Sequence, residues 1–409
     1  MNLVFRLAWR NLWRQPRRTW LTTGAMVFSN MLLVFMISLQ FGMYGLMIDN
    51  TLQTFTGHIQ IQAPGYLDDQ KMRQTVAKIV PLADSLRTAF PEERIAARAS
   101  GFALASSEDR SYGIAVIGIE PDYEFGVSTL PGLISEGRYL QDFDAAEIVI
   151  GAALARNLRV GLGDELTLLG SGLDGSFAAA VVNVVGIFDS GIADFDRSIS
   201  EVPLGLFQDV FYMNGSGHHV VINSGGIDGV GELQSQVGAA LPTDQDLVVH
   251  DWDALQPGLQ QAIKADMSSA FFMYGILVVL VAFSVLNTQL MSVLERTHEF
   301  GIVMSLGLTP GRLGRLVLLE TTIMGLMGLF LGALLGGLFT YWFSVNGFAY
   351  PGMDEMAAKF NLPARFFPQV STPSLLIGPA VVFIFTILAA VYPALRLHKL
   401  HPVEAMRAV

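Results

Sequence analysis

The chain has 409 residues, of which 52% are apolar and only 15% charged; it contains no cysteine, and its formal net charge is −11. A mean hydropathy of +0.46 excludes both a disordered chain and an ordinary soluble protein. The lack of cysteine excludes a disulfide scaffold, a thiolate metal site and a cysteine nucleophile, and the acidic balance argues against nucleic acid as the main partner.

Four apolar stretches are long enough to cross a bilayer, which takes about 20 residues of helix. They are residues 20–48, 268–294, 316–345 and 375–395. We therefore predict a polytopic α-helical membrane protein with four transmembrane helices in a one-plus-three layout. A large α+β domain, residues 49–267, lies between helices one and two. The first apolar run is too long for a cleaved signal peptide, so we expect it to remain as a helix.

The distribution of charge predicts the orientation. The first 19 residues hold five arginines and no acid, the 295–315 loop and the 396–409 tail are also net basic, and the segments 49–267 and 346–374 are strongly acidic. Basic segments stay in the cytoplasm. Both termini and the 295–315 loop are therefore expected inside, and the large domain and the short 346–374 loop outside.

The outer domain is predicted to mix strands and helices. Alternation at 58–62 indicates a half-buried strand, and apolar spacing over 76–90 indicates a helix that Pro81 should kink or break. Further strands are expected at 112–119, 147–151, 165–169, 181–188 and 219–223, helices at 152–158 and 255–264, and a hairpin loop at 170–176.

No catalytic constellation stands out in this domain, and no nucleophile-elbow motif is present. His218 and His219 are interpreted as a surface or strand pair in preference to a metal site, because no third ligand stands at a suitable spacing. Four acidic residues are interpreted as a solvated face, with a binding rim as the alternative: Asp189, Asp194, Asp196 and Glu201.

The chain lacks the sequence motif with which P-loop ATPases bind ATP. None of its five lysines follows a glycine, so the Gly-Lys-Ser/Thr core of a P-loop is missing. Glu320 is the one ionisable residue expected inside a span, near its cytoplasmic edge, which disfavours a gradient-driven carrier. Energy would then come from a separate ATPase.

The stretch Leu294–Leu313, LERTHEFGIVMSLGLTPGRL, fills the loop expected in the cytoplasm. Glu295 and Glu299 stand one helical turn apart, and Ile302, Val303 and Leu306 are expected to form one apolar face. This pattern predicts a short amphipathic helix that docks into a groove on a cytoplasmic partner. Residues Gly307 to Gly311 are expected to stop it, and Pro310 to start the next helix. A helix lying on the bilayer surface is the alternative.

That stretch resembles the signature loop of FtsX-like ABC permeases, the MacB/LolC/LolE/FtsX superfamily of type VII ABC transporters. Four further segments extend the resemblance over nearly the whole chain: LAWRNLWRQPRRTWLT, EIVIGAALARNLRVGLGDELTLLG, VVNVVGIFDSG and YPALRLHKLHPVEAMR. With GHIQIQAPGY after the first span, the chain looks most similar to lipoprotein-releasing permeases of the LolC/LolE kind.

The resemblance implies a multi-pass protein of the bacterial inner membrane with its large domain in the periplasm. It implies a cytoplasmic ABC ATPase dimer that binds ATP and Mg, while this chain itself binds no cofactor or metal. Further implied partners are a second permease (a paralogue or a second copy), a periplasmic carrier or adaptor, a lipoprotein or lipid cargo, and membrane lipid. The residues implied to couple to the ATPase are Glu295, Arg296, Glu299, Phe300, Gly301, Val303, Leu306, Gly307 and Arg312.

Two sets of residues are singled out in the spans. Gly328, Gly332 and Gly336 repeat every four residues and should let a neighbouring helix approach closely. Adaptable apolar side chains in the first span suit an acyl-chain contact with the cargo, although ordinary lipid-facing positions are the alternative. These candidates are Met36, Phe41, Met43 and Met47.

The implied mechanism is mechanical: ATP-driven closure of the ATPase moves the coupling segment, and the long spans carry that motion outward to extract a lipoprotein or lipid. The 170–179 segment, GSGLDGSFAA, lacks the longer proline-bearing hook of LolC, so direct docking of a carrier is in doubt. Two alternatives remain: a MacB-like efflux or secretion permease with an adaptor and an outer-membrane duct, and an FtsX-like signalling protein that transports nothing.

Overall fold

The computed structural model describes residues 3–397 apart from 228, 350 and 352–364. The predicted tail beyond residue 397 and residues 350 and 352–364 of the predicted 346–374 loop lie outside the described residues. The chain divides into two compact units. The helical unit comprises residues 1–44, 262–350 and 365–409, and the α+β unit comprises residues 45–261 with 351–364.

Four long helices in the described part of the chain are apolar enough to cross a membrane: Pro16–Thr56, Pro257–Glu295, Pro310–Asn346 and Thr372–Arg396. They correspond to α2 (Pro16–Thr51) with its π-helical end η1 (Leu52–Thr56), then α11, α13 and α15. Three begin at proline, which suits a helix start because its missing N–H would be unpaired there anyway. The fourth begins in a capping box between Ser371 and Ser374.

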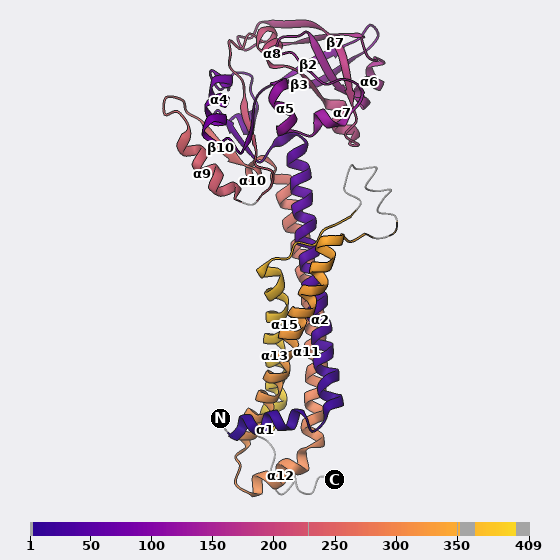
Figure 1. Ribbon diagram of the computed structural model, residues 1–409, viewed down its shortest axis with the longest axis vertical. Coiled ribbons are helices and arrows are strands. Elements are labelled where there is room, and N and C mark those ends of the chain that lie inside the picture. Colours follow the sequence, from indigo (N-terminus) through magenta and orange to yellow (C-terminus); the bar gives the residue numbers. More distant parts are fainter. Residues whose placement is uncertain (1–2, 228, 350, 352–364, 398–409) are drawn as a thin grey trace. The chain divides into compact units, whose positions relative to one another are not determined.

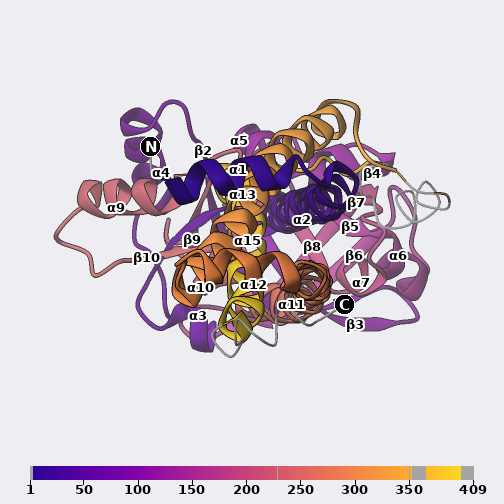
Figure 2. The same cartoon turned by 90° about the horizontal axis from the view of Figure 1, so that it is seen from below.

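A short helix, α1 (Leu3–Leu12), crosses the ends of the long helices (Figures 1 and 2). Its Ala8 and Leu12 are buried against Leu316, Ile323 and Met324 of α13. The opposite side of α1 leaves Trp9 exposed. Since α1 precedes α2 by only a few residues, this packing determines where the first long helix begins.

The three glycines spaced by four residues on α13 lie against α2. A Cβ atom on Gly332 would stand 2.4 Å from the Cβ of Asn30, and one on Gly328 would stand 2.8 Å from the Cβ of Met26. Asn30 Nδ2 donates a hydrogen bond to the Gly328 carbonyl at 3.1 Å. A Cβ atom on Gly336 would likewise crowd Met31 and Val34. The two backbones therefore approach too closely for a side chain at these positions.

Gly332→Leu should separate α2 from α13, because overpacking a tight contact costs about 1–3 kcal/mol. The thermal unfolding midpoint of the detergent-solubilised protein should fall. Gly24→Leu is the matched control, since a Cβ there meets nothing within 4 Å. Equal unfolding midpoints for the two variants would contradict a packing role for Gly332.

The α+β unit is built on one ten-stranded mixed sheet in the order β10-β1-β9-β2-β3-β8-β5-β7-β4, with β6 paired to β2 and β7. Only β3–β8 and β5–β7 run parallel. The strands are β1 (Ile59–Gln62), β2 (Arg94–Ser106), β3 (Ser111–Ile119), β4 (Ile134–Gly137), β5 (Glu147–Gly151), β6 (Glu165–Ser171), β7 (Phe177–Phe188), β8 (Ile199–Pro203), β9 (His219–Asn223) and β10 (Val248–Asp251).

Short helices cover the sheet (Figure 1). They are α3 (Tyr66–Asp69), α4 (Ile79–Ala89), α5 (Pro121–Val127), the 3-10 turn η2 (Leu130–Leu133), α6 (Ala152–Leu158), α7 (Ala193–Ser198), α8 (Leu204–Val210), α9 (Val230–Ala240) and α10 (Trp252–Leu255). The isoleucines of β1 pack with apolar residues of α4 and α9 in the main core. The alternation of β1 therefore points Ile59 and Ile61 inward and Gln60 and Gln62 to the other face.

All six predicted strands are present, but the longest strand of the sheet was not predicted. β2 reads RIAARASGFALAS, whose small residues carry a weak strand signal, and only its pairing with β3, β6 and β9 makes it a strand. The expected break at Pro81 is wrong, because Pro81 lies in the first turn of α4, where no hydrogen bond is lost. The expected half-exposure of β1 is also wrong, since all four of its residues are buried.

The predicted acidic face is wrong for two of its four members. Asp189 and Asp194 are exposed, but Asp196 is 3% exposed and Glu201 is fully buried. Asp196 accepts hydrogen bonds from the Ser190 backbone and hydroxyl. Glu201 accepts one from the Tyr139 hydroxyl at 2.6 Å. Both carboxyl groups are internal structural contacts.

The two adjacent histidines are buried, so their interpretation as a surface pair is wrong, although His219 does begin strand β9. His218 Nδ1 accepts a hydrogen bond from the Ser100 backbone N–H at 2.9 Å. No cluster of three or more potential metal ligands occurs among the described residues.

A buried charge cluster ties the end of the first long helix to the sheet. Arg98 and Glu124 are fully buried and form an ion pair. Arg98 also donates to the carbonyl of Phe55 in η1 at 2.5 Å. Burial and the neighbouring Glu124 carboxylate raise the pKa of Glu201 to about 8. At neutral pH Glu201 is therefore mainly protonated, which limits the number of buried charges.

Because the folded-state pKa of Glu201 lies above its ordinary 4.5, stability that is present below pH 4.5 is lost as pH rises toward about 8. The expected slope approaches ~1.4 kcal/mol per pH unit within that window. Glu201→Gln should remove the slope, and Glu136→Gln, an exposed control, should keep it. Hydrogen exchange of the β8 amides in the full chain, corrected for intrinsic rates, measures this. An unchanged slope in Glu201→Gln would contradict the assignment.

Candidate functional site

The predicted coupling segment is a separate short helix held at a sharp junction. α11 ends at Glu295, and α12 (Thr297–Ser305) begins after Arg296. The Arg296 guanidinium lies 3.1 Å from a Glu320 carboxylate oxygen and 4.9 Å from the centre of the Phe300 ring. This single side chain therefore fastens the junction to both α12 and α13.

One side of α12 is buried and the other is free. Phe300, Gly301 and Met304 are buried, the two large side chains in a cluster with residues of α11 and α13. Ile302 is 43% exposed, and Leu306, just after the helix, is 81% exposed. The predicted single apolar face is wrong for Val303, which packs against the buried cluster, because it is rotated about 100° from Ile302.

The turn after α12 is made by Gly307, whose φ of +99° favours glycine. As predicted, Pro310 begins α13. Arg312 is exposed in the first turn of that helix. Leu306, Gly307 and Arg312 are therefore accessible in this chain, whereas Phe300 and Gly301 are buried beneath that surface.

A set of ionic contacts joins α12 to the beginning of the chain. Arg14 pairs with Glu299 at 3.0 Å, and both side chains are exposed. Arg18 pairs with Glu295 at 3.5 Å and donates to the Ser292 hydroxyl at 2.6 Å.

A second, buried contact lies beneath them. Asn11 donates to Glu320 at 2.7 Å, and Glu320, which also binds Arg296, is only 4% exposed. The lone carboxylate of the third span is thus paired. This contact could not be predicted from the sequence, because Asn11 lies far from Glu320 along the chain.

Arg14→Glu should place like charges beside Glu299 and loosen α12. Exposed ion pairs are worth ~0.2–1 kcal/mol, so amide exchange over residues 297–305 should rise by about fivefold at most. Adding Glu299→Arg should restore the wild-type rate. Arg17→Glu is the control, because Arg17 is exposed and forms no ion pair within the described part of the chain. Failure of the double variant to recover would contradict the pairing.

The four candidate cargo residues all lie on the first long helix, but only three share a face. Met36, Met43 and Met47 are separated by seven and four residues, which places them on one side of α2, and each is about two-fifths exposed. Phe41 points away from that side. The methionine face is therefore a row of three, without the phenylalanine.

A network of hydrogen bonds between α2 and α11 was not predicted from the sequence. The Tyr44 hydroxyl donates to Asp266 at 2.6 Å, Gln40 Nε2 donates to Tyr44 at 2.6 Å, and the Tyr274 hydroxyl donates to Gln40 Oε1 at 2.9 Å. Each residue looks unremarkable in the sequence, because the network forms only once the two helices are side by side.

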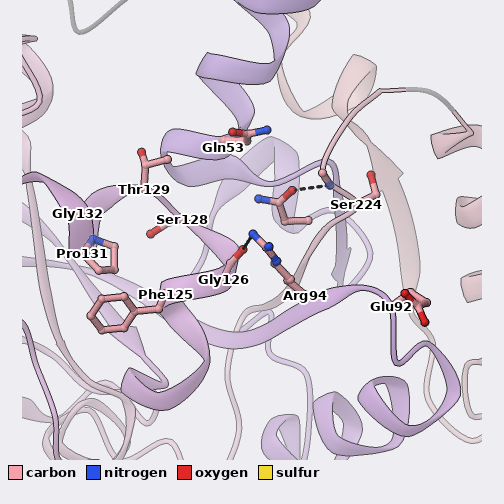
Figure 3. A pocket seen from close by; sticks show the side chains of 12 residues that line it. Gln53, Glu92, Arg94, Phe125, Gly126, Ser128, Thr129, Pro131, Gly132 and Ser224 are labelled. Carbon is pink, nitrogen blue, oxygen red and sulfur yellow. Dashed lines mark hydrogen bonds between the residues drawn. The ribbon is translucent and has the colours of Figure 1, made fainter.

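The α+β unit contains an open polar cavity of about 590 Å³ (Figure 3). Gln53 stands on one side and Arg94, which donates to the Gly126 carbonyl at 3.4 Å, on the other. Ser128 and Thr129 line the wall between them. Glu92 also lines the cavity, and within the described structure the Ser128 hydroxyl has no hydrogen-bond partner.

The 170–179 segment is a hairpin: a compact turn at 172–176 between the end of β6 and the start of β7. Gly172 N–H donates to the Ser176 carbonyl at 2.9 Å, and Asp174 accepts from the Ser176 backbone and hydroxyl. The turn joins β6 to β7 directly, as the hairpin prediction requires.

Comparison with known families matches residues 19–241 to the MacB-like periplasmic core domain and residues 271–402 to the FtsX-like permease C-terminal domain. The lipoprotein-releasing system transmembrane protein LolC of Xylella fastidiosa is 24% identical over 307 residues, which cover 71% of this chain and 72% of that protein. The ABC transporter permease YknZ of Bacillus subtilis is 26% identical over 233 residues, 55% of this chain and 54% of that protein. The solved periplasmic region of MacB from Actinobacillus actinomycetemcomitans aligns with a TM-score of 0.35 and 16% identity, over 52% of this chain and 96% of that one.

Proposed function

This chain belongs to the FtsX-like permease family with a MacB-like periplasmic core domain, and we propose that it extracts lipoproteins or lipids from the periplasmic leaflet of the bacterial inner membrane. It is an ABC-transporter permease, a class whose members work with an ATPase. In the proposal, ATP and Mg bind to that separate subunit, and both termini of this chain face the cytoplasm.

The observation that carries the coupling step is the two-sided nature of α12. Its inner side is fixed by Phe300 and Met304, so the helix can transmit force. Its outer side presents Ile302 and Leu306 as an exposed apolar pair flanked by Glu299. An apolar anchor with charges beside it suits insertion into a groove of a folded partner.

Motion of α12 would pass to the start of the first span through Arg14–Glu299, and the Arg18–Glu295 pair would hold α2 to the end of α11 beside it. α2 and its π-helical end form one continuous rod from Pro16 to Thr56. The rod ends where the Phe55 carbonyl binds Arg98 of the sheet. A push at α12 would therefore be carried along the first long helix.

The cargo assignment is supported by the likeness to LolC proteins, which are named as lipoprotein-releasing, and by the methionine face of α2. A second permease, a paralogue or a second copy, would complete the cargo path. The tight 172–176 turn leaves little surface for a carrier, so carrier docking is assigned to the second permease.

A MacB-like efflux or secretion role with an adaptor and an outer-membrane duct is the second candidate. It is favoured by the match of more than half the chain to the MacB-like core domain. The two roles share the same coupling step and differ in the partners on the periplasmic side.

Leu306→Asp should remove the ATPase from the purified complex, because loss of a central apolar anchor costs ~2 kcal/mol or more, about a thirtyfold drop in affinity. Leu162→Asp, which changes an exposed leucine of the α+β unit, should leave the ATPase bound. Purification from native membranes in mild detergent, followed by mass spectrometry, measures both.

The same purification separates the candidate functions. A second LolC-like permease with bound lipoproteins supports extraction, whereas an adaptor with an outer-membrane duct supports efflux. A peptidoglycan hydrolase in their place would indicate FtsX-like signalling. Recovery of the ATPase with Leu306→Asp at the wild-type level would contradict the coupling assignment.

A further inference from the structure

The short helix α1 is fixed on one side and free on the other. Ala8 and Leu12 are buried against α13. Arg6 and Arg10 each stand two residues before one of these buried positions, which is about 200° around the helix, and both are exposed. Neither arginine forms an ion pair within the described part of the chain. The free side of α1 therefore carries positive charge that no described residue neutralises.

A row of exposed tryptophans runs along the flank of α1 and continues onto the first long helix. The ring centres of Trp9 and Trp13 are 6.1 Å apart, and those of Trp13 and Trp20 are also 6.1 Å apart. Between 44% and 50% of each of these side chains is exposed. Trp20 belongs to α2, where the next residue, Leu21, is 76% exposed at the start of the apolar span. The row is therefore continuous with the surface that α2 presents to hydrocarbon.

This arrangement is the one that a helix lying in a membrane surface requires. α1 lies across the ends of the long helices (Figures 1 and 2), so a bilayer that those helices span has its surface in the plane of α1. Tryptophan rings are enriched at the boundary between hydrocarbon and headgroups. Arginine side chains on the polar side of an interfacial helix reach the headgroups. The continuity of the tryptophan row with the first span therefore favours a bilayer as the partner of this surface.

The charge of this surface favours an anionic headgroup over a zwitterionic one. The first 19 residues hold five arginines and no acid. The nearby carboxylates of Glu299 and Glu295 are already paired, with Arg14 and Arg18. The two free arginines of α1 are therefore available to a phosphate group. One arginine at an anionic membrane surface strengthens binding by about fivefold.

We propose that the surface formed by Arg6, Trp9, Arg10, Trp13 and Trp20 binds an anionic phospholipid of the surrounding bilayer. The arginines hold the headgroup phosphate, and the tryptophans contact the glycerol and the upper part of the acyl chains. The proposal goes beyond the transport function, because it concerns a lipid of the membrane and needs neither cargo nor ATPase. In the orientation proposed above, this lipid lies in the cytoplasmic leaflet, opposite to the leaflet of the cargo.

The test measures tryptophan fluorescence of the full chain in lipid nanodiscs. Bromine atoms on an acyl chain quench a tryptophan that the chain contacts, so the probes are brominated phosphatidylglycerol and brominated phosphatidylcholine at equal mole fractions. Trp252→Phe and Trp342→Phe leave only the three tryptophans of the row, because the chain has five in all. Both lipids should quench, and the phosphatidylglycerol should bind at least about fivefold more tightly.

A pair of arginine substitutions tests the headgroup contact. Arg6→Gln with Arg10→Gln should bring the two lipids close to equal binding, while quenching itself remains because the tryptophans are unchanged. Arg73→Gln with Arg156→Gln removes the same charge from exposed positions of the α+β unit and should keep the preference. Should the chain with fewer tryptophans fail to fold, native mass spectrometry counts the phosphatidylglycerol retained by the otherwise unaltered chain. Arg6→Gln with Arg10→Gln should then retain fewer molecules than the control pair.

Four outcomes would overturn the proposal. Equal binding of the two lipids, or an unchanged preference after Arg6→Gln with Arg10→Gln, would remove the anionic headgroup. The absence of quenching by either lipid would show that this surface does not lie against the bilayer. Loss of the preference in millimolar inorganic phosphate, but not in sodium chloride of equal ionic strength, would indicate a site for a free anion instead.

Discussion

The contact on which the helical unit depends is the buried pair between Arg296 and Glu320. A carboxylate inside an apolar helix is costly unless it is paired, and removing one member of a buried pair leaves an uncompensated charge. Glu320 is satisfied by Arg296 at the junction of two helices and by Asn11 of α1. Pairing of the Glu320 carboxylate therefore requires α11 to end before Arg296, α12 to follow as a separate helix, and α1 to pack against α13. The orientation of α12 follows from that requirement.

The α+β unit depends on a comparable group of its own. Arg98 is fully buried, and its guanidinium is satisfied by Glu124 and by the Phe55 carbonyl. Because that carbonyl belongs to the last turns of the first long helix, the helix end is part of the domain core. Glu201, held largely neutral beside this pair, is a second acidic residue buried at low cost. In each unit, an arginine paired with a buried glutamate joins segments that are distant in sequence.

The Arg296–Glu320 contact also holds the candidate docking surface in place. α12 and the residue after it present an exposed apolar pair, Ile302 and Leu306, supported from beneath by Phe300 and Met304. That combination suits a folded partner. Family membership accounts for the permease role.

The sequence alone determined the features that depend on local composition and spacing. Length and hydropathy were enough for the long apolar helices, alternation for β1, and the Glu295–Arg312 pattern for a short helix ended by Gly307 and followed by Pro310. Only the tertiary structure decided which of these residues are free. Val303 turns inward, Asp196 and Glu201 are buried, Gln62 faces His219, and β2 is a strand at all because three other strands pair with it. Burial and pairing are set by contacts between residues far apart in the chain, and those contacts leave no periodic trace in the sequence.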